Sequence, residues 1–235
     1  MKTEKTIGII GAMEDEVAAL KKAMADAETI HEAGMEFVCG TIGNVKAIAV
    51  QCGMGKVNAG VCAQLLISLF HADAVINTGV AGSLNNDLDI GDIVISKDAV
   101  QHDFDVSAIG FAKGEIPYTG LYAFEADSDL QALAKDAVTA VCSDIKAVSG
   151  RICSGDQFIA SKIQKQKIID EFHGDCAEME GAAIAQVCYL NRIPFVIIRA
   201  ISDKADDSEE VSFELFAKQA AANSSSAVLY MLANL

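Results

Sequence analysis

Arginine is scarce in this chain, and this scarcity limits the possible partners. The 235 residues carry a formal net charge of -15 at pH 7, and the only arginines are Arg151, Arg192 and Arg199. A negative field of this size repels phosphate groups. We therefore expect no nucleic acid, no membrane headgroups and no other polyanion among the partners.

Paired cysteines and metal-ligand spacings are also missing. The 7 cysteines are odd in number and never spaced Cys-X-X-Cys. This pattern is typical of reduced, buried thiols in a cytosolic protein rather than of a disulfide framework or a zinc site. The 4 histidines form no metal-ligand spacing either. The sequence thus predicts neither a metal nor a cofactor.

Long uninterrupted apolar runs are absent as well. No run approaches the length of a transmembrane helix without a charge or a glycine break. Residues 1–5 lead directly into an apolar strand, without the apolar core of a secretory signal. We expect a cytoplasmic protein that does not enter a membrane.

Apolar sequence does occur, in short pieces that alternate between strand and helix patterns. Hydrophobic residues make up 51% of the chain, enough to bury a large core in one domain over residues 1–235. Strands are expected at residues 6–11, 36–42, 45–52, 74–78, 93–100, 147–154 and 195–201, and helices at 15–24, 56–70, 128–142, 162–172, 181–191 and 212–233. The alternation predicts a mostly parallel, twisted sheet covered on both faces, and the hairpin around Gly43-Asn44 makes it mixed. The expected fold class is therefore an α/β protein, a three-layer α/β/α sandwich.

Charged side chains gather where the predicted strands end. An apolar strand runs into Arg199 and Asp203, and Glu180 lies where a shorter strand turns into a helix. Ligands bind at the carboxyl ends of strands in open α/β sheets, so these groups are expected to share one crevice. An unpaired buried arginine is costly, so Arg199 is expected to meet Glu180 or Glu178. The two glutamates suit the diol of a ribose, but they also fit a solvated acidic pair at a helix start.

Acids also fill the turn after the first strand, at Glu14, Asp15 and Glu16. They satisfy the positive end of a helix and repel a pyrophosphate, and the G-x-G-x-x-G spacing of a dinucleotide site is missing. Glu16 is either an ordinary dipole partner or a functional acid.

The glycines at 53–55 and 79–82 predict tight turns with close backbone approach. The long, partly apolar segment 101–124 predicts a lid or a subunit contact.

Six motifs occur in one order over nearly the whole chain: GIIGAMEDEV, CGMGKVNA, INTGVAG, SGDQFI, AEMEGAAIA and RAISDKAD. Together they resemble the nucleoside phosphorylase/hydrolase superfamily, and within it the 5′-methylthioadenosine/S-adenosylhomocysteine nucleosidases. The resemblance implies a nucleoside phosphorylase-like fold. It also implies hydrolysis of the N-glycosidic bond of an adenosine with a 5′-thio substituent, a reaction of methionine salvage.

The resemblance implies a division of roles among the buried polar residues. Asp203 would protonate adenine N7, and Glu16 would hold and activate the attacking water. Glu180 would accept hydrogen bonds from the ribose hydroxyls, while Arg199 and Ser202 would orient the acids and the water. Glycoside cleavage through an oxocarbenium-like state needs such a pair, one acid for the leaving group and one carboxylate for the water.

The resemblance also implies apolar walls. Phe158 would stack on adenine, and the backbone of Ile159 would read its edge. Phe111 and Pro117 would close the 5′ end of a neighbouring subunit's pocket, which implies a homodimer. The remaining substrate-binding residues would be Met54, Val80, Val106, Ile109, Met179 and Phe213. Val80 lacks the hydroxyl of a serine common in the family, and Ile109 replaces an aromatic side chain often found near the 5′ group.

Two other functions remain open on the sequence. A phosphate-dependent purine nucleoside phosphorylase of the same fold would need a cationic cradle, yet no arginine precedes Arg151. A non-catalytic nucleoside-binding module would not need a proton donor at Asp203. Hydrolysis is the favoured interpretation.

Overall fold

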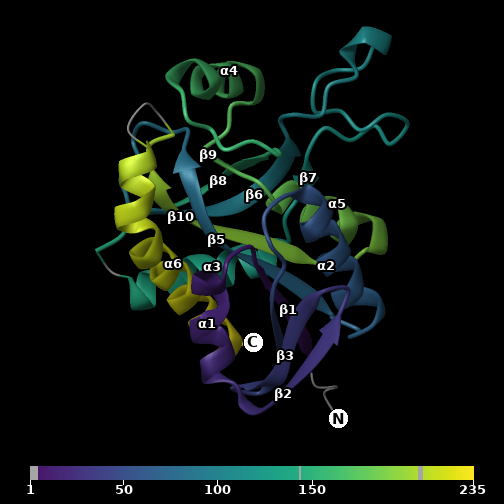
Figure 1. Cartoon of the computed structure of the whole chain (residues 1–235), viewed down its shortest axis with the longest axis vertical. Helices are drawn as coiled ribbons and strands as arrows, with labels where there is room; N and C mark the ends of the chain where they lie inside the picture. Colours follow the sequence, from purple (N-terminus) through teal and green to yellow (C-terminus); the bar gives the residue numbers. More distant parts are fainter. Residues whose placement is uncertain (1–4, 143, 206–208) are drawn as a thin grey trace.

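A 10-stranded sheet forms the centre of the protein (Figure 1). The computed structural model describes residues 5–142, 144–205 and 209–235, without the side chains of 209–215. The strands are β1 (Thr6–Gly11), β2 (Ala25–Glu32), β3 (Met35–Ile42), β4 (Val45–Gln51), β5 (Ala74–Ser83), β6 (Ile93–Gln101), β7 (Phe124–Glu125), β8 (Ala147–Ser154), β9 (Cys176–Glu178) and β10 (Phe195–Asp203).

Helices cover both faces of the sheet, as the three-layer prediction requires. They are α1 (Glu14–Ala23), α2 (Lys56–Ser68), α3 (Ser128–Val141), α4 (Lys162–Phe172), α5 (Gly181–Asn191) and α6 (Glu209–Ala233), with a short 3₁₀ helix η1 (Ser107–Ile109). One layer contains α6 with α1 and α3, and the other contains α2 with α5 (Figure 1). The predicted α/β class with a mixed central sheet is confirmed. Among the described residues, none of the helices combines the length and apolar character needed to cross a bilayer.

The strand order brings the site-bearing strands side by side. The order is β10-β6-β8-β9-β5-β1-β4-β3-β2, and β10 also pairs with β5, so β5, β9, β8, β6 and β10 close a ring. Strand β5 runs parallel to β1 on one side and to β10 on the other. Three parallel strands therefore end together at one edge, and their carboxyl ends carry the residues that follow β1, β5 and β10 into the site.

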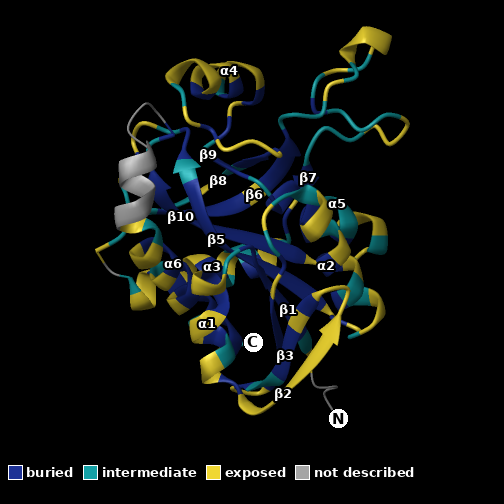
Figure 2. Cartoon of the chain, in the orientation of Figure 1, coloured by how far each residue is buried: buried dark blue, intermediate teal, exposed yellow. Residues whose placement is uncertain are grey.

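Three strands differ from the prediction, including the two-residue β7, which was not predicted. Strand β5 continues through residues 79–82, predicted as a turn, because β10 pairs with it along this stretch. Strand β2 was missed because every one of its residues is exposed, so no apolar alternation marks it. Its pairing with β3 alone holds it at the edge of the sheet (Figure 2).

The contact between α2 and β1 shows how closely the layers pack. Leu66 of α2 is fully buried, and a Cβ atom on Gly8 of β1 would lie only 2.9 Å from its Cδ1 atom. The missing side chain of Gly8 thus makes room for Leu66 against the sheet.

We expect Leu66→Ala to lower the free energy of unfolding by about 2–5 kcal/mol, because the truncation leaves a cavity against the strand. The control is Ile163→Ala, which removes an aliphatic side chain that is 83% exposed on α4 and should change stability by about 0.5 kcal/mol or less. Urea unfolding of both variants measures the difference. Equal effects would show that Leu66 does not fill the α2–β1 contact.

Candidate active site

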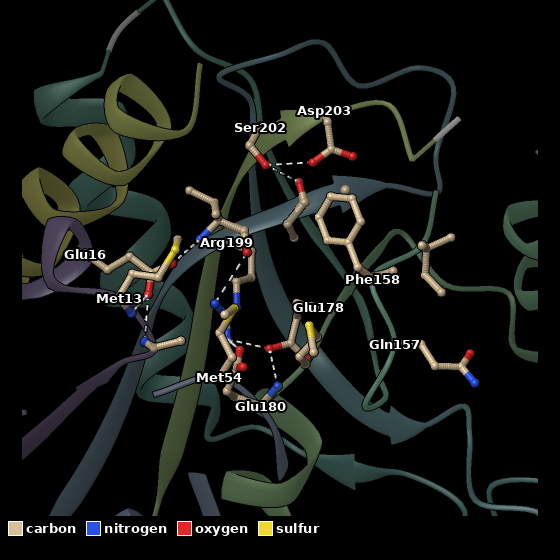
Figure 3. A pocket seen from close by; sticks show the side chains of 17 residues that line it. Met13, Glu16, Met54, Gln157, Phe158, Glu178, Glu180, Arg199, Ser202 and Asp203 are labelled. Carbon is tan, nitrogen blue, oxygen red and sulfur yellow. Dashed lines mark hydrogen bonds and ion pairs between the residues drawn. The ribbon is translucent and has the colours of Figure 1, made fainter. Parts of the chain in front are cut away.

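A cleft opens at the carboxyl ends of β1, β5, β9 and β10, with about 580 Å³ of empty space when its open mouth is included. Its described lining consists of Ala12, Met13, Glu16, Met54, Arg199, Ser202, Asp203 and residues 80–82, 157–159 and 177–180. The crevice predicted from the strand ends is therefore present, and it contains the predicted Glu16, Glu180, Arg199, Ser202 and Asp203 together (Figure 3).

Glu16 is held at the edge of the cleft by backbone donors. Its Oε2 accepts hydrogen bonds from the amides of Ala12 at 2.7 Å and Met13 at 2.9 Å, and its Oε1 accepts one from Val80 at 3.0 Å. Burial raises the pKa of Glu16, against the opposing effects of Arg199 and these amides. The carboxylate caps the start of α1 and also faces the cleft, so the two sequence interpretations of Glu16 are compatible. The backbone of Val80, not a side-chain hydroxyl, supplies the contact at that position.

Asp203 lies buried at the end of β10 and is oriented by its neighbours. Its Oδ2 accepts a hydrogen bond of 2.8 Å from the hydroxyl of Ser202, and its Oδ1 accepts one of 2.9 Å from the amide of Ala205. Figure 3 shows this carboxyl group at the end of the pocket near Phe158, away from Glu16. The arrangement separates the two acids across the cleft.

Arg199 is the buried cation of the site, with an exposed fraction of 1%. Its Nη2 donates to Glu178 and, at 2.7 Å, to the Oδ1 of Asn77, and it lies 3.5 Å from the Oε2 of Glu180. The sequence left open which glutamate pairs with Arg199, and the structure places both beside it. A Cβ atom on Gly79 would collide with Arg199 and with Glu16, which explains the glycine within β5.

Glu178 and Glu180 have different environments although they are two residues apart. Glu178 ends β9, and its Oε2 accepts from the amides of Glu180 at 3.1 Å and Gly181 at 2.8 Å, so it caps the start of α5. Glu180 is the N-cap residue of α5, and its Oε1 accepts from the amide of Gly55 at 2.8 Å. Burial, followed by the charge of Glu178, raises the pKa of Glu180 to about 7.

The opposite wall of the cleft is apolar. Phe158 is half-exposed there and Ile159 is buried, while Met54 and Met179 add apolar surface to the lining nearer Glu180. Flexible methionine and aromatic side chains make an adaptable apolar surface. One side of the cleft can therefore take a flat ring or a thioether while the other offers oxygens.

The other predicted residues lie outside the cleft or outside the described side chains. The segment after β6, with Val106, Ile109, Phe111 and Pro117, does not line the cleft formed by this chain. Phe213 lies outside the side chains that the structure describes. The predicted roles of these residues stay predictions.

Several residues of the site had no clear signal in the sequence. Asn77 lies within the predicted strand 74–78 and received no role, yet its Nδ2 donates to the carbonyl of Ile10 at 2.9 Å and its Oδ1 accepts from Nη2 of Arg199. Gln157 precedes Phe158 in the SGDQFI motif and lines the cleft. One signal could have identified Asn77 as a hydrogen-bonding residue of the site. It is a polar residue within an apolar strand, and a buried polar side chain needs hydrogen-bond partners.

The site can supply acid–base chemistry and polar recognition without a cation other than Arg199. Among the described lining residues, Glu16, Glu178, Glu180 and Asp203 are acids and Arg199 is the only cation. In the same part of the chain, no group of three or more His, Cys, Asp or Glu side chains could hold a metal ion.

Known proteins resemble this chain over nearly its whole length. The model of the Phosphorylase superfamily matches residues 6–233. A 5′-methylthioadenosine/S-adenosylhomocysteine nucleosidase of Staphylococcus carnosus is 43% identical over 230 residues, which cover 97% of this chain and 100% of that protein.

Two solved structures of such nucleosidases have the same fold. The enzyme of Neisseria meningitidis, in complex with methylthio-immucillin-A, has a TM-score of 0.95 at 39% identity over 98% of this chain and 100% of that one. The enzyme of Colwellia psychrerythraea 34H, in complex with adenine, has a TM-score of 0.95 at 41% identity over 99% and 96% of the two chains. The chain therefore belongs to the phosphorylase superfamily and, within it, to the family of 5′-methylthioadenosine/S-adenosylhomocysteine nucleosidases.

Proposed function

We propose that the protein hydrolyses the N-glycosidic bond of 5′-methylthioadenosine and S-adenosylhomocysteine, releasing adenine and the 5-thioribose sugar. The observation that carries this proposal is the charge of the cleft. Its described lining has Arg199 as its only cation, and Glu178 and Glu180 lie beside that cation. A phosphate ion would meet the acids rather than a cradle of donors, which favours water over phosphate as the nucleophile. A thioether, in contrast, suits the apolar wall.

The proposed acid is Asp203. It would give a proton to N7 of adenine, so that the base leaves without building up negative charge. The Ser202 hydroxyl holds Oδ2, and the Ala205 amide holds Oδ1, which limits the rotation of the carboxyl group. Phe158 would stack on the departing base, and the backbone of Ile159 would read its edge.

The proposed base is Glu16. Attack at the anomeric carbon requires a water that is held and partly deprotonated as the oxocarbenium-like state develops. The backbone amides of Ala12, Met13 and Val80 fix the carboxylate, and Arg199 opposes the effect of burial on its pKa. The amides and Arg199 thus stabilise the ionised form against burial, although the net pKa stays raised.

Glu180 would accept hydrogen bonds from the ribose hydroxyls. Its Oε1 is already occupied by the Gly55 amide and its Oε2 faces Arg199, so the carboxylate has a fixed orientation with remaining acceptor sites. Met179 precedes Glu180 in the chain, Met54 precedes the Gly55 that donates to it, and both methionines line the cleft. They would cover the sugar and its 5′ substituent.

We also propose that the protein acts as a homodimer of one-domain chains in the cytoplasm. Large apolar side chains are exposed in the segment after β6 and along α2: Ile109, Tyr118, Val57 and Val61. Such surfaces mark contacts with another chain. Phe111 and Pro117 would close the 5′ end of the partner's cleft. Val106, Ile109 and Phe213 would belong to the apolar wall that takes the 5′ substituent of the substrate.

The proposal predicts turnover without phosphate. In phosphate-free buffer the protein should release adenine from 5′-methylthioadenosine together with free 5-methylthioribose, and added phosphate should not raise the rate. Mass spectrometry of the sugar product makes the measurement. A sugar 1-phosphate that forms only with phosphate would show the phosphorylase alternative, and tight binding without turnover would show the binding module.

Asp203→Asn should reduce kcat by about 10²–10⁴-fold, because the amide cannot donate the proton that an acid catalyst supplies. Adenine binding, measured by calorimetry, should stay near that of the unmodified protein, since the amide retains the shape and one acceptor oxygen. Turnover close to normal would remove Asp203 from its proposed role.

The raised pKa of Glu16 predicts the acidic limb of the pH profile. The base must be ionised, and its pKa lies above the ordinary value of 4.5. As pH falls, kcat/KM should therefore drop in two steps, one near pH 7 as the ribose-binding Glu180 is protonated and one above pH 4.5 as Glu16 is protonated. The step due to Glu16 should persist in Glu180→Gln and disappear in Glu16→Gln, whose rate is uniformly low. A Glu180→Gln variant that loses both steps would contradict the assignment to Glu16.

A further inference from the structure

Two segments that line the cleft come from distant parts of the chain but are joined directly. The turn before α2 contains Met54 and Gly55, and Gly55 holds Glu180 through its amide. The loop after β8 contains Gln157 and Phe158. Lys56 follows Gly55 in the first segment, and Asp156 precedes Gln157 in the second. The amide of Lys56 donates a hydrogen bond to the side chain of Asp156 and so joins the two segments.

Asp156 supplies a cap that α2 lacks in its own sequence. The N-cap residue of α2 is Gly55, which has no side chain to cap the helix, and the first turn contains no acid. The Oδ1 of Asp156 accepts a hydrogen bond of 2.8 Å from the amide of Lys56. A negative group at this end of a helix is favourable. Gly55 has a φ of +98°, and a Cβ there would lie 3.1 Å from that oxygen, so the glycine allows the close approach.

Asp103, from a third segment, binds both Lys56 and Asp156, and we call these three residues the junction. The Oδ2 of Asp103 accepts from the amide of Asp156 at 2.9 Å, and its Oδ1 pairs with Nζ of Lys56 at 2.5 Å. Burial has the largest single effect and raises the pKa of Asp103, but the hydrogen bonds from Lys56 and Asp156 and the nearby positive charge together lower the net pKa. Nζ of Lys56 also donates to Gln101 at 3.1 Å. The junction is therefore charged, complementary and held at several points.

The junction fixes the distance between two parts of the cleft. On one side, Gly55 directs the carboxylate proposed to bind the ribose, and on the other, Phe158 is proposed to stack on the base. We infer that Asp156 is a positioning residue that holds the ribose and base subsites at the spacing of one nucleoside. This inference rests on the proposed function, because it assigns the two subsites to the two halves of that substrate.

A ligand that spans both subsites should depend on this junction more than a ligand that fills one. Asp156→Ala removes the cap and should raise KM for 5′-methylthioadenosine about fivefold, the effect of a lost helix cap, while kcat changes by less than about twofold. The affinity for adenine alone, measured by calorimetry, should change by less than about twofold, because adenine occupies one subsite. Asp156→Asn keeps an oxygen that can accept from Lys56 and should restore most of the lost KM.

The control is Asp136→Ala, which removes an exposed aspartate from α3, and its KM should match that of the unmodified protein. Unmodified protein without hydrolytic activity would refute the proposed function itself. With that activity present, an unchanged KM in Asp156→Ala would overturn the inference. Equal weakening of adenine and nucleoside would also overturn it, because the residue would then order only the base loop. A fall in kcat and thermal stability at constant KM would show a merely structural role and overturn it too.

Discussion

The buried guanidinium of Arg199 is the interaction on which the rest of the site depends. A carboxylate taken out of water is costly unless a charge or hydrogen bonds compensate it. Arg199 lies against Glu178 and Glu180 and acts on Glu16 through its charge. The strand positions around it follow from this need, since Gly79 leaves room for the guanidinium and Asn77 accepts one of its hydrogens. One cation thus allows several acids to be buried at the same sheet edge.

This balance also restricts the chemistry. Arg199 is the single cation among the described lining residues, and Glu178 and Glu180 already lie against it, so it has no charge to spare for a phosphate. What remains accessible is a pair of acids on different sides of the cleft, Glu16 and Asp203, which suits proton transfer to a base and from a water. Their separate environments, backbone amides at Glu16 and the Ser202 hydroxyl at Asp203, are consistent with the different tasks proposed for the two carboxyl groups.

Most of the buried framework could be predicted from the sequence, because burial leaves a pattern of apolar residues. The strand leading to Arg199 and Asp203 is buried throughout, and its polar end therefore stood out. Strand β2 could not be predicted, because only its partner β3 keeps it extended. The continuation of β5 through Gly79 depends on pairing with β10, which local sequence does not encode. Likewise, the spacing of Glu178 and Glu180 indicated a pair of acids, but only the turn into α5 decides that one caps the helix and the other meets Gly55.

The buried acids of the site lower the stability of the fold at neutral pH. The direction of this effect follows from their raised pKa values. A carboxyl group whose pKa is higher in the folded state than in the unfolded chain stabilises the fold while protonated. For Glu180, this contribution is lost as pH rises from its ordinary value of 4.5 to about 7, and burial of Glu16 acts in the same direction. At neutral pH the acids therefore weaken the fold that holds them. The dense packing of both helix layers, with Leu66 inserted over Gly8 as one example, offsets this cost away from the cleft, so that the acids can be kept for chemistry rather than for stability.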